Sequence, residues 1–281
     1  MKNARFLLII PALLLSSCDE SYTYGTKIKA AKAQELIEEM VNDRDIEPPT
    51  SYTVDFNMEQ IEGDKQKTTT KVRYKLKAAD NNLYYNIKYT SNAGTAKKNY
   101  NIQYYVFTDT RYGQIDYMKV QELTTEAEQE IAMPRAYSYY YTQPAIFSDI
   151  DFSELSYFLQ LGTNQSFAWS ALETYSKEDY FDSDDDFTYK RNFYSSGKGN
   201  IVMKINVNNK VKNSKYDYEE TKSGFMLVII EKYLAKKVES NQTTVYGNED
   251  KFKLEYSYPK ALKVTPPEDW ESALPSSYKK N

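Results

Sequence analysis

The stretch that decides the fold reads Tyr52-Thr53-Val54-Asp55-Phe56-Asn57-Met58-Glu59. Apolar and polar side chains alternate in it without a break, so an extended chain would have one apolar face and one polar face. The same period of two returns at residues 71–77, 85–89, 100–107 and 115–120. Turn-forming Gly, Asp and Asn residues separate these segments. The first half of the chain therefore predicts a meander of antiparallel strands joined by hairpins.

The remaining segments complete a mostly β fold with minor α. Further strands are expected at residues 187–194, 201–207, 215–220, 225–238, 242–246 and 251–258. An amphipathic helix is expected over residues 27–43, with Thr26 as its N-cap, because apolar residues recur there at helical spacing. Shorter helices are expected at residues 124–132, 153–161 and 165–175. The prediction is a strongly curved antiparallel sheet or half-barrel, with the amphipathic helix at the N-terminus and a few helices in the middle.

The N-terminus predicts export and a lipid anchor. Lys2 and Arg5 precede a short apolar run, residues 6–15, which is too short to span a membrane and is typical of a secretory signal. The run ends Leu15-Ser16-Ser17-Cys18, which resembles the lipobox of bacterial lipoproteins. That resemblance implies cleavage before Cys18 and a diacylglyceryl group on its thiol, and two acyl chains hold a protein stably at a membrane. The alternative is an ordinary signal peptide with an incidental cysteine.

The motif also sets the expected location and domain boundaries. The protein would lie outside the cytoplasm, on the outer face of the cytoplasmic membrane or on an outer membrane. Residues 1–17 would be the signal peptide and 18–26 the lipidated cysteine with a tether. Residues 27–265 would form a single β-rich domain, and residues 266–281, with their prolines, a C-terminal tail.

Composition excludes several kinds of chemistry. The chain has no His, and its one Cys is the expected anchor, so the usual catalytic base and the Ser–His and Cys–His pairs are missing. Two of the 36 basic residues lie in the signal, which leaves 34 basic against 40 acidic residues, a net charge of −6. That balance argues against nucleic acid as a partner. We expect a non-catalytic monomer without a cofactor.

An acidic loop raises the question of calcium. Asp182, Asp184 and Asp186 occupy the first, third and fifth places of an EF-hand loop. The sixth place is Phe187 instead of Gly, and the twelfth is Phe193 instead of Glu. The sharp turn and the bidentate ligand are therefore missing, which favours a solvated acidic turn over a calcium site and predicts no metal.

The order of elements resembles the LolA-like lipoprotein-carrier superfamily, which includes periplasmic lipoprotein chaperones and lipidated lipid-transfer proteins. The segment Phe252-Lys253-Leu254-Glu255-Tyr256-Ser257-Tyr258 is similar to the closing strand of that family, and Leu262-Lys263-Val264-Thr265-Pro266-Pro267 is similar to its ending. The resemblance implies an incomplete β-barrel whose apolar inner face holds acyl chains behind a helical plug.

Two functional hypotheses follow. In the first, a lipid or other apolar ligand lies in the half-barrel. Its walls would include Val54, Phe56, Tyr85 and Ile87. The plug would include Leu155, Phe158, Leu159, Phe167 and Trp169. All of these residues serve equally well as ordinary core. In the second, the protein binds a protein or glycan partner through exposed tyrosines around Tyr137–Tyr141, since 28 of its residues are Tyr.

Overall fold

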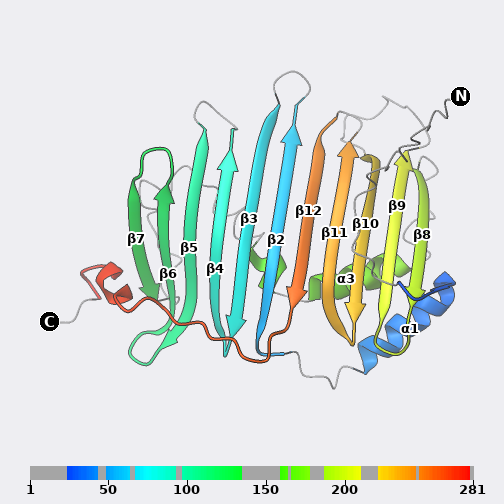
Figure 1. The fold of residues 1–281 in the computed structure, drawn as a ribbon, viewed down its shortest axis with the longest axis horizontal. Helices are drawn as coiled ribbons and strands as arrows, with labels where there is room; N and C mark the ends of the chain where they lie inside the picture. Colours follow the sequence, from blue (N-terminus) through cyan, green and yellow to red (C-terminus); the bar gives the residue numbers. More distant parts are fainter. Residues whose placement is uncertain are drawn as a thin grey trace, which may run out of the picture.

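The computed structural model describes residues 24–43, 49–63, 67–92, 97–134, 159–163, 166–177, 187–209, 221–244 and 247–278. These residues contain twelve strands in one antiparallel sheet that does not close (Figure 1). The order across the sheet is β1-β8-β9-β10-β11-β12-β2-β3-β4-β5-β6-β7. The expected mostly β class, with an open curved sheet and minor α, is confirmed.

The first half of the sheet is the predicted meander. Its strands are β2 (Tyr52–Glu62), β3 (Thr68–Ala79), β4 (Asn82–Ser91), β5 (Lys98–Asp109), β6 (Gly113–Glu122) and β7 (Glu128–Pro134). The β3–β4 hairpin turns at Asp80 and Asn81, whose φ angles of 50° and 65° are left-handed, a conformation that Asp and Asn tolerate better than most residues. Residues 124–132 were expected to form a helix, and this was wrong. Glu126, with a φ of 59°, turns the chain. The residues after it then pair with the edge of β6 in an antiparallel ladder and form β7.

The second half contains β8 (Phe187–Ser195), β9 (Ile201–Asn209), β10 (Thr221–Glu231), β11 (Leu234–Thr244) and β12 (Glu249–Ser257). The single strand expected at 225–238 is a hairpin instead. It turns at Lys232 and Tyr233, with φ angles of 50° and 64°, and Asn200 Oδ1 accepts the Lys232 amide at 2.9 Å. Neither residue is a usual turn former, so the turn depends on this contact from the β8–β9 loop. The expected strand at 215–220 lies outside the described residues.

The N-terminal segment begins with a strand. β1 (Thr26–Ile28) pairs with β8, and α1 (Ala30–Asn42) follows it. The expected cap at Thr26 is therefore wrong, and the N-cap is Lys29, which makes no side-chain capping bond. The apolar stripe of α1 buries Ala33, Ile37 and Met40, as its spacing predicts. The second long helix, α3 (Ser166–Ser176), confirms the helix expected at 165–175, and residues 159–163 are helical too.

The two faces of the sheet differ. The inner face carries the main core, against which α1, α3 and the helical residues 159–163 pack. The outer face carries the polar side chains of the alternation. Near β5–β7 it bears the 3-10 helix η4 (Trp270–Ala273), which the C-terminal segment reaches by crossing the lower ends of the strands (Figure 1). Trp270 is buried there, with its ring 5.1 Å from that of Phe107.

Candidate functional site

The four residues expected to line a cavity lie together on the inner face. Val54 and Phe56 come from β2, and Tyr85 and Ile87 from β4, with β3 between them. Each is at most 2% exposed. The Phe56 ring stacks on Tyr74 at 4.6 Å, and Tyr74 meets Tyr85 edge-on at 5.6 Å. The sequence pattern placed these four residues on the inner face, where protein atoms cover them, and their role as walls of a ligand cavity stays a prediction.

A short helical segment, residues 159–163, lies over this surface and is held by phenol groups. Tyr52 Oη donates to the Thr163 carbonyl at 2.7 Å, and Tyr256 Oη donates to the Leu161 carbonyl at 3.3 Å. Tyr85 Oη makes a longer contact of 3.5 Å with the Leu159 carbonyl. Carbonyls at the end of a helix lack intrahelical donors, so phenols that rise from the sheet satisfy them. We call residues 159–163 with these tyrosines the phenol latch.

Gly162 allows the phenol latch to lie close to the sheet. A Cβ atom at this position would clash with the Tyr74 hydroxyl oxygen, so any larger residue would require the buried Tyr74 ring to shift. The helical segment therefore approaches the sheet most closely at Gly162, which has no side chain. The sequence signal for this contact is the number of Tyr residues at inward strand positions, whose hydroxyls need acceptors when they are buried.

Burial raises the pKa of Tyr52, Tyr74 and Tyr256 above the ordinary value for tyrosine. Burial also raises the pKa of Tyr105, on the outer face, to about 12. A phenol is charged only when it has lost its proton, so the desolvated sites favour the neutral form. These hydroxyls therefore stay protonated, and able to donate, throughout the physiological pH range.

The raised pKa values predict alkaline unfolding. A group whose folded pKa exceeds its unfolded value gives a stability contribution that is complete below the unfolded pKa, here about 10, and that falls as pH rises toward the folded pKa. For Tyr105 the window is about pH 10–12. We expect the denaturant midpoint to be constant up to about pH 9 and to fall steadily above pH 10. Urea titrations at several pH values, followed by circular dichroism, would measure it, and a constant midpoint at pH 11 would contradict it.

The expected plug residues divide into three groups. Leu159 is 8% exposed and belongs to the main core. Phe167 and Trp169 on α3 are half-buried against that core, and the Phe167 ring lies 5.9 Å from Phe252 on β12. Leu155 and Phe158 lie outside the described residues. The described plug residues thus cover the sheet, with Leu159 in the phenol latch and the other two on the neighbouring helix.

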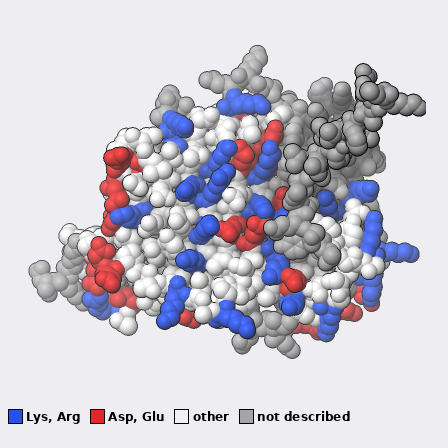
Figure 2. Space-filling model, in the orientation of Figure 1, with Lys and Arg blue, Asp and Glu red and all other residues white. Residues whose placement is uncertain are grey.

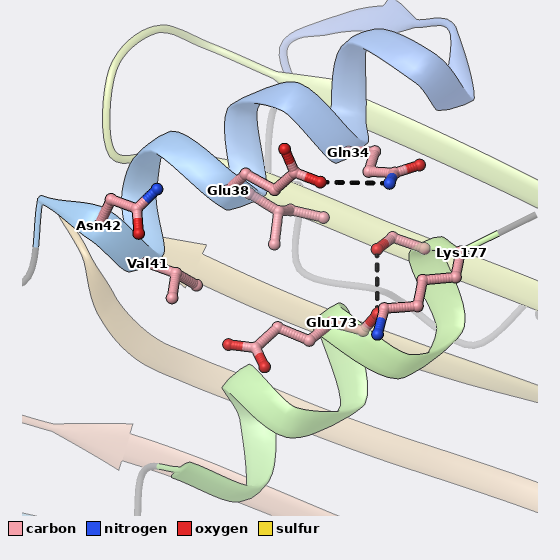
Figure 3. Close-up of a pocket in the computed structure, with 8 residues that line it drawn as sticks. Gln34, Glu38, Val41, Asn42, Glu173 and Lys177 are labelled. Atoms are coloured by element: carbon pink, nitrogen blue, oxygen red, sulfur yellow. Dashed lines mark hydrogen bonds between the residues drawn. The ribbon is translucent and has the colours of Figure 1, made fainter.

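A crevice of about 270 Å³ separates α1 from α3 (Figure 3). Ile37 and Val41 supply apolar side chains to its wall. Charged and polar groups complete the lining: Gln34, Glu38, Asn42, Glu173, Ser176 and Lys177. The Gln34 amide donates to Glu38 at 3.2 Å along α1 (Figure 3). The crevice is open to solvent and is suited to a small amphipathic molecule, but none of the residues expected from sequence lies in it.

The outer face carries a second aromatic group that the sequence reasoning missed. Tyr84 and Tyr105 are cross-strand partners, both half-exposed, with ring centroids 4.5 Å apart. The signal was present in the doublets Tyr84-Tyr85 and Tyr104-Tyr105. Since successive residues of a strand point to opposite faces, each doublet places one ring inside and one outside.

The described residues contain neither a cluster of metal ligands nor a helix that could span a membrane. Within the described ranges, no group of three or more acidic, His or Cys side chains is arranged to hold a metal ion. The acidic loop 182–186 lies outside these ranges. Among the same residues, no helix has the length and apolar character needed to cross a membrane.

Comparison with known proteins adds little. No family model matches the sequence, and no curated protein matches it. Among solved structures, the chain is similar to a DUF1329 family protein from Desulfovibrio piger, with 12% sequence identity and a TM-score of 0.24. The match covers 83% of this chain and 95% of the other. A likeness at this level does not bear on function.

Proposed function

We propose that this chain is a lipid-anchored extracytoplasmic binding protein that holds a lipid or another apolar ligand against the inner face of its sheet, without catalysing a reaction. The observation that carries the proposal is the phenol latch. It joins an apolar sheet face to a helical segment through hydrogen bonds that can be exchanged for others. A closure of this kind can open when a ligand supplies equivalent contacts.

The chemistry of the latch favours an apolar ligand with a polar head. If residues 159–163 moved away, the tyrosine hydroxyls would remain on an apolar surface without acceptors, which is unfavourable. The ester, carboxylate or phosphate oxygens of a lipid would accept these hydrogen bonds, while its acyl chains covered residues such as Ile87 and Phe56. The same phenols would then hold either the closed segment or the ligand head.

The anchor would keep this face near the membrane. From Cys18 to Tyr24 the chain has six residue steps, so even fully extended it reaches only about 20 Å. A lipid source or acceptor would therefore lie within a domain diameter of the sheet. The alternative, a partner bound through Tyr137–Tyr141, falls on residues outside the described ranges.

Native mass spectrometry tests the proposal. Residues 21–281, purified from a bacterial host without detergent, are expected to carry an added mass that dissociates as a phospholipid or fatty acid. The double variant Tyr52→Phe/Tyr256→Phe removes two latch donors, each worth about 1 kcal/mol, and is expected to exchange added lipid several-fold faster. Tyr84→Phe, on the outer face, is the matched control. A chain that stays free of ligand after incubation with lipid vesicles would refute the proposal.

A further inference from the structure

On the outer face, β4 and β5 form a strip with one charged residue, beside the basic residues of β3. Its three cross-strand rows are Tyr84–Tyr105, Asn86–Gln103 and Lys88–Asn101, so a single charge occurs among six positions. The four residue steps from Tyr84 to Lys88 extend it over about 13 Å. Figure 2 shows Lys and Arg side chains over the middle strands of this face, with acidic side chains among them. We call these six residues the amide strip.

The amides of this strip have unused hydrogen-bonding capacity. Neither Asn86 nor Gln103 makes a side-chain hydrogen bond with any residue that the structure describes, although an amide has both donors and acceptors. Asn101 Oδ1 is buried and has no partner within the same ranges. Adjacent amides at cross-strand spacing can together contact the neighbouring hydroxyls of a sugar ring. The half-exposed Tyr84 and Tyr105 rings supply the apolar surface on which such a ring stacks.

Three cations, two beside the amide strip and one on it, form no ion pair with described residues. On β3, the Lys71 ammonium lies 2.7 Å from a Glu59 carboxylate oxygen, and the Lys75 ammonium lies 3.8 Å from one of Asp55. Arg73 and Lys77, on the same strand, have no carboxylate partner among the described residues. Lys77 lies instead over the Tyr84 ring, 6.0 Å from its centroid. Lys88, on the strip itself, has no carboxylate partner either.

The placement of two of these cations is unfavourable for the protein alone. Arg73 and Lys88 are direct cross-strand partners, and like charges in this position repel. The chain as a whole has a net charge of −4, so acidic residues are not in short supply. A bound anion would remove the repulsion. This combination of paired rings, free amides and uncompensated cations has the chemistry of a site for a negatively charged sugar.

We propose that the amide strip binds an anionic oligosaccharide, one that carries uronate or sulfate groups. A sugar ring stacks on Tyr84, Asn86 and Gln103 bind its hydroxyls, and Arg73, Lys77 and Lys88 bind its anionic groups. The site lies on the opposite face from the phenol latch and does not rest on the lipid proposed above. A protein tethered by lipid would in this way also contact the polysaccharide of a cell envelope or of its surroundings.

Calorimetric titration of the full-length chain in detergent tests this. The probes are a uronic-acid oligosaccharide, a sulfated oligosaccharide and a neutral glucose oligosaccharide of equal length. We expect at least one anionic probe to bind about tenfold or more tightly than the neutral one, with an affinity that falls as salt is raised. Arg73→Gln/Lys88→Gln and Tyr84→Ala should each weaken binding about tenfold.

The matched control removes two charges from the same face outside the strip. In Lys251→Gln/Lys253→Gln both lysines are already ion-paired, with Glu249 and Glu255, and binding should be unchanged. Equal weakening in this control would overturn the site, as would equal binding of all three probes. If anionic phospholipid vesicles bind and the sugars do not, the proposal that the amide strip binds an oligosaccharide is wrong. Loss of lipid co-purification with glycan binding intact would refute only the inner-face proposal.

Discussion

Phe56→Ala is expected to lower the free energy of unfolding by ~3–5 kcal/mol, the usual result of removing a large aromatic side chain from a packed core. Phe56 is 1% exposed, stacks on Tyr74 and pairs in register with Leu254. Its ring therefore joins β2 to both neighbouring strands at the centre of the sheet. Urea denaturation followed by tyrosine fluorescence would measure the loss.

The neighbouring residue provides the control for this substitution. Asn57 is on the same strand but points to the exposed outer face, so Asn57→Ala should change stability by no more than about 0.5 kcal/mol. A Phe56→Ala variant within 1 kcal/mol of the parent would mean that the inner face can collapse or is filled by something other than protein.

Cys18→Ser is expected to release the protein from the membrane almost completely. In the proposed lipoprotein, the acyl chains on Cys18 are the main attachment to the membrane. A single acyl chain binds only with about 10⁴ M⁻¹, and two chains bind stably, so loss of both leaves no comparable attachment. Fractionation of cells that express the full chain would show the protein moving from the membrane pellet to the soluble fraction.

Ser17→Ala serves as the control for the anchor, because a small residue is kept before the cysteine and lipidation should continue. Metabolic labelling with a fatty acid should mark the parent and this control but not the Cys18→Ser variant. Complete retention of the unlabelled variant in the membrane pellet would show that something other than lipid holds the protein.

The alternating pattern predicted the first half of the fold well because local chemistry determines it. In β2–β6 almost every inward position is apolar, and the β3–β4 and β5–β6 hairpins turn at residues that favour turns, such as Asp80, Asn81 and Gly113, so pattern and structure agree there. The β10–β11 hairpin was missed because its turn residues, Lys232 and Tyr233, gain their left-handed conformation from a contact with Asn200, about thirty residues away. β7 was missed because its Glu-rich start resembles a helix, and only the open edge of β6 makes it a strand.

The candidate sites show the same contrast between features that local sequence determines and features that depend on distant contacts. The burial of Val54, Phe56, Tyr85 and Ile87 could be predicted from sequence because burial follows from alternation, whereas their contact with a ligand stays a prediction. The latch could not be found, since its bonds join Tyr52 to Thr163 and Tyr256 to Leu161 across long stretches of chain. The amide strip was missed because no single segment contains it. Asn86 and Gln103 become neighbours only through the register of β4 and β5.

The central position of β12 bears on how the chain is made. Strands β2–β7 form one series of local hairpins and β8–β11 another, but β2 pairs with β12, so that Thr53 meets Ser257 across nearly the whole sequence. Such a distant pairing has a large loop-closure entropy and slows folding. In the exported protein that we propose, the β2 edge would therefore stay unpaired until the last strand had crossed the membrane. An unpaired edge invites association with other chains. We expect the newly exported protein to depend on an envelope chaperone until β12 arrives.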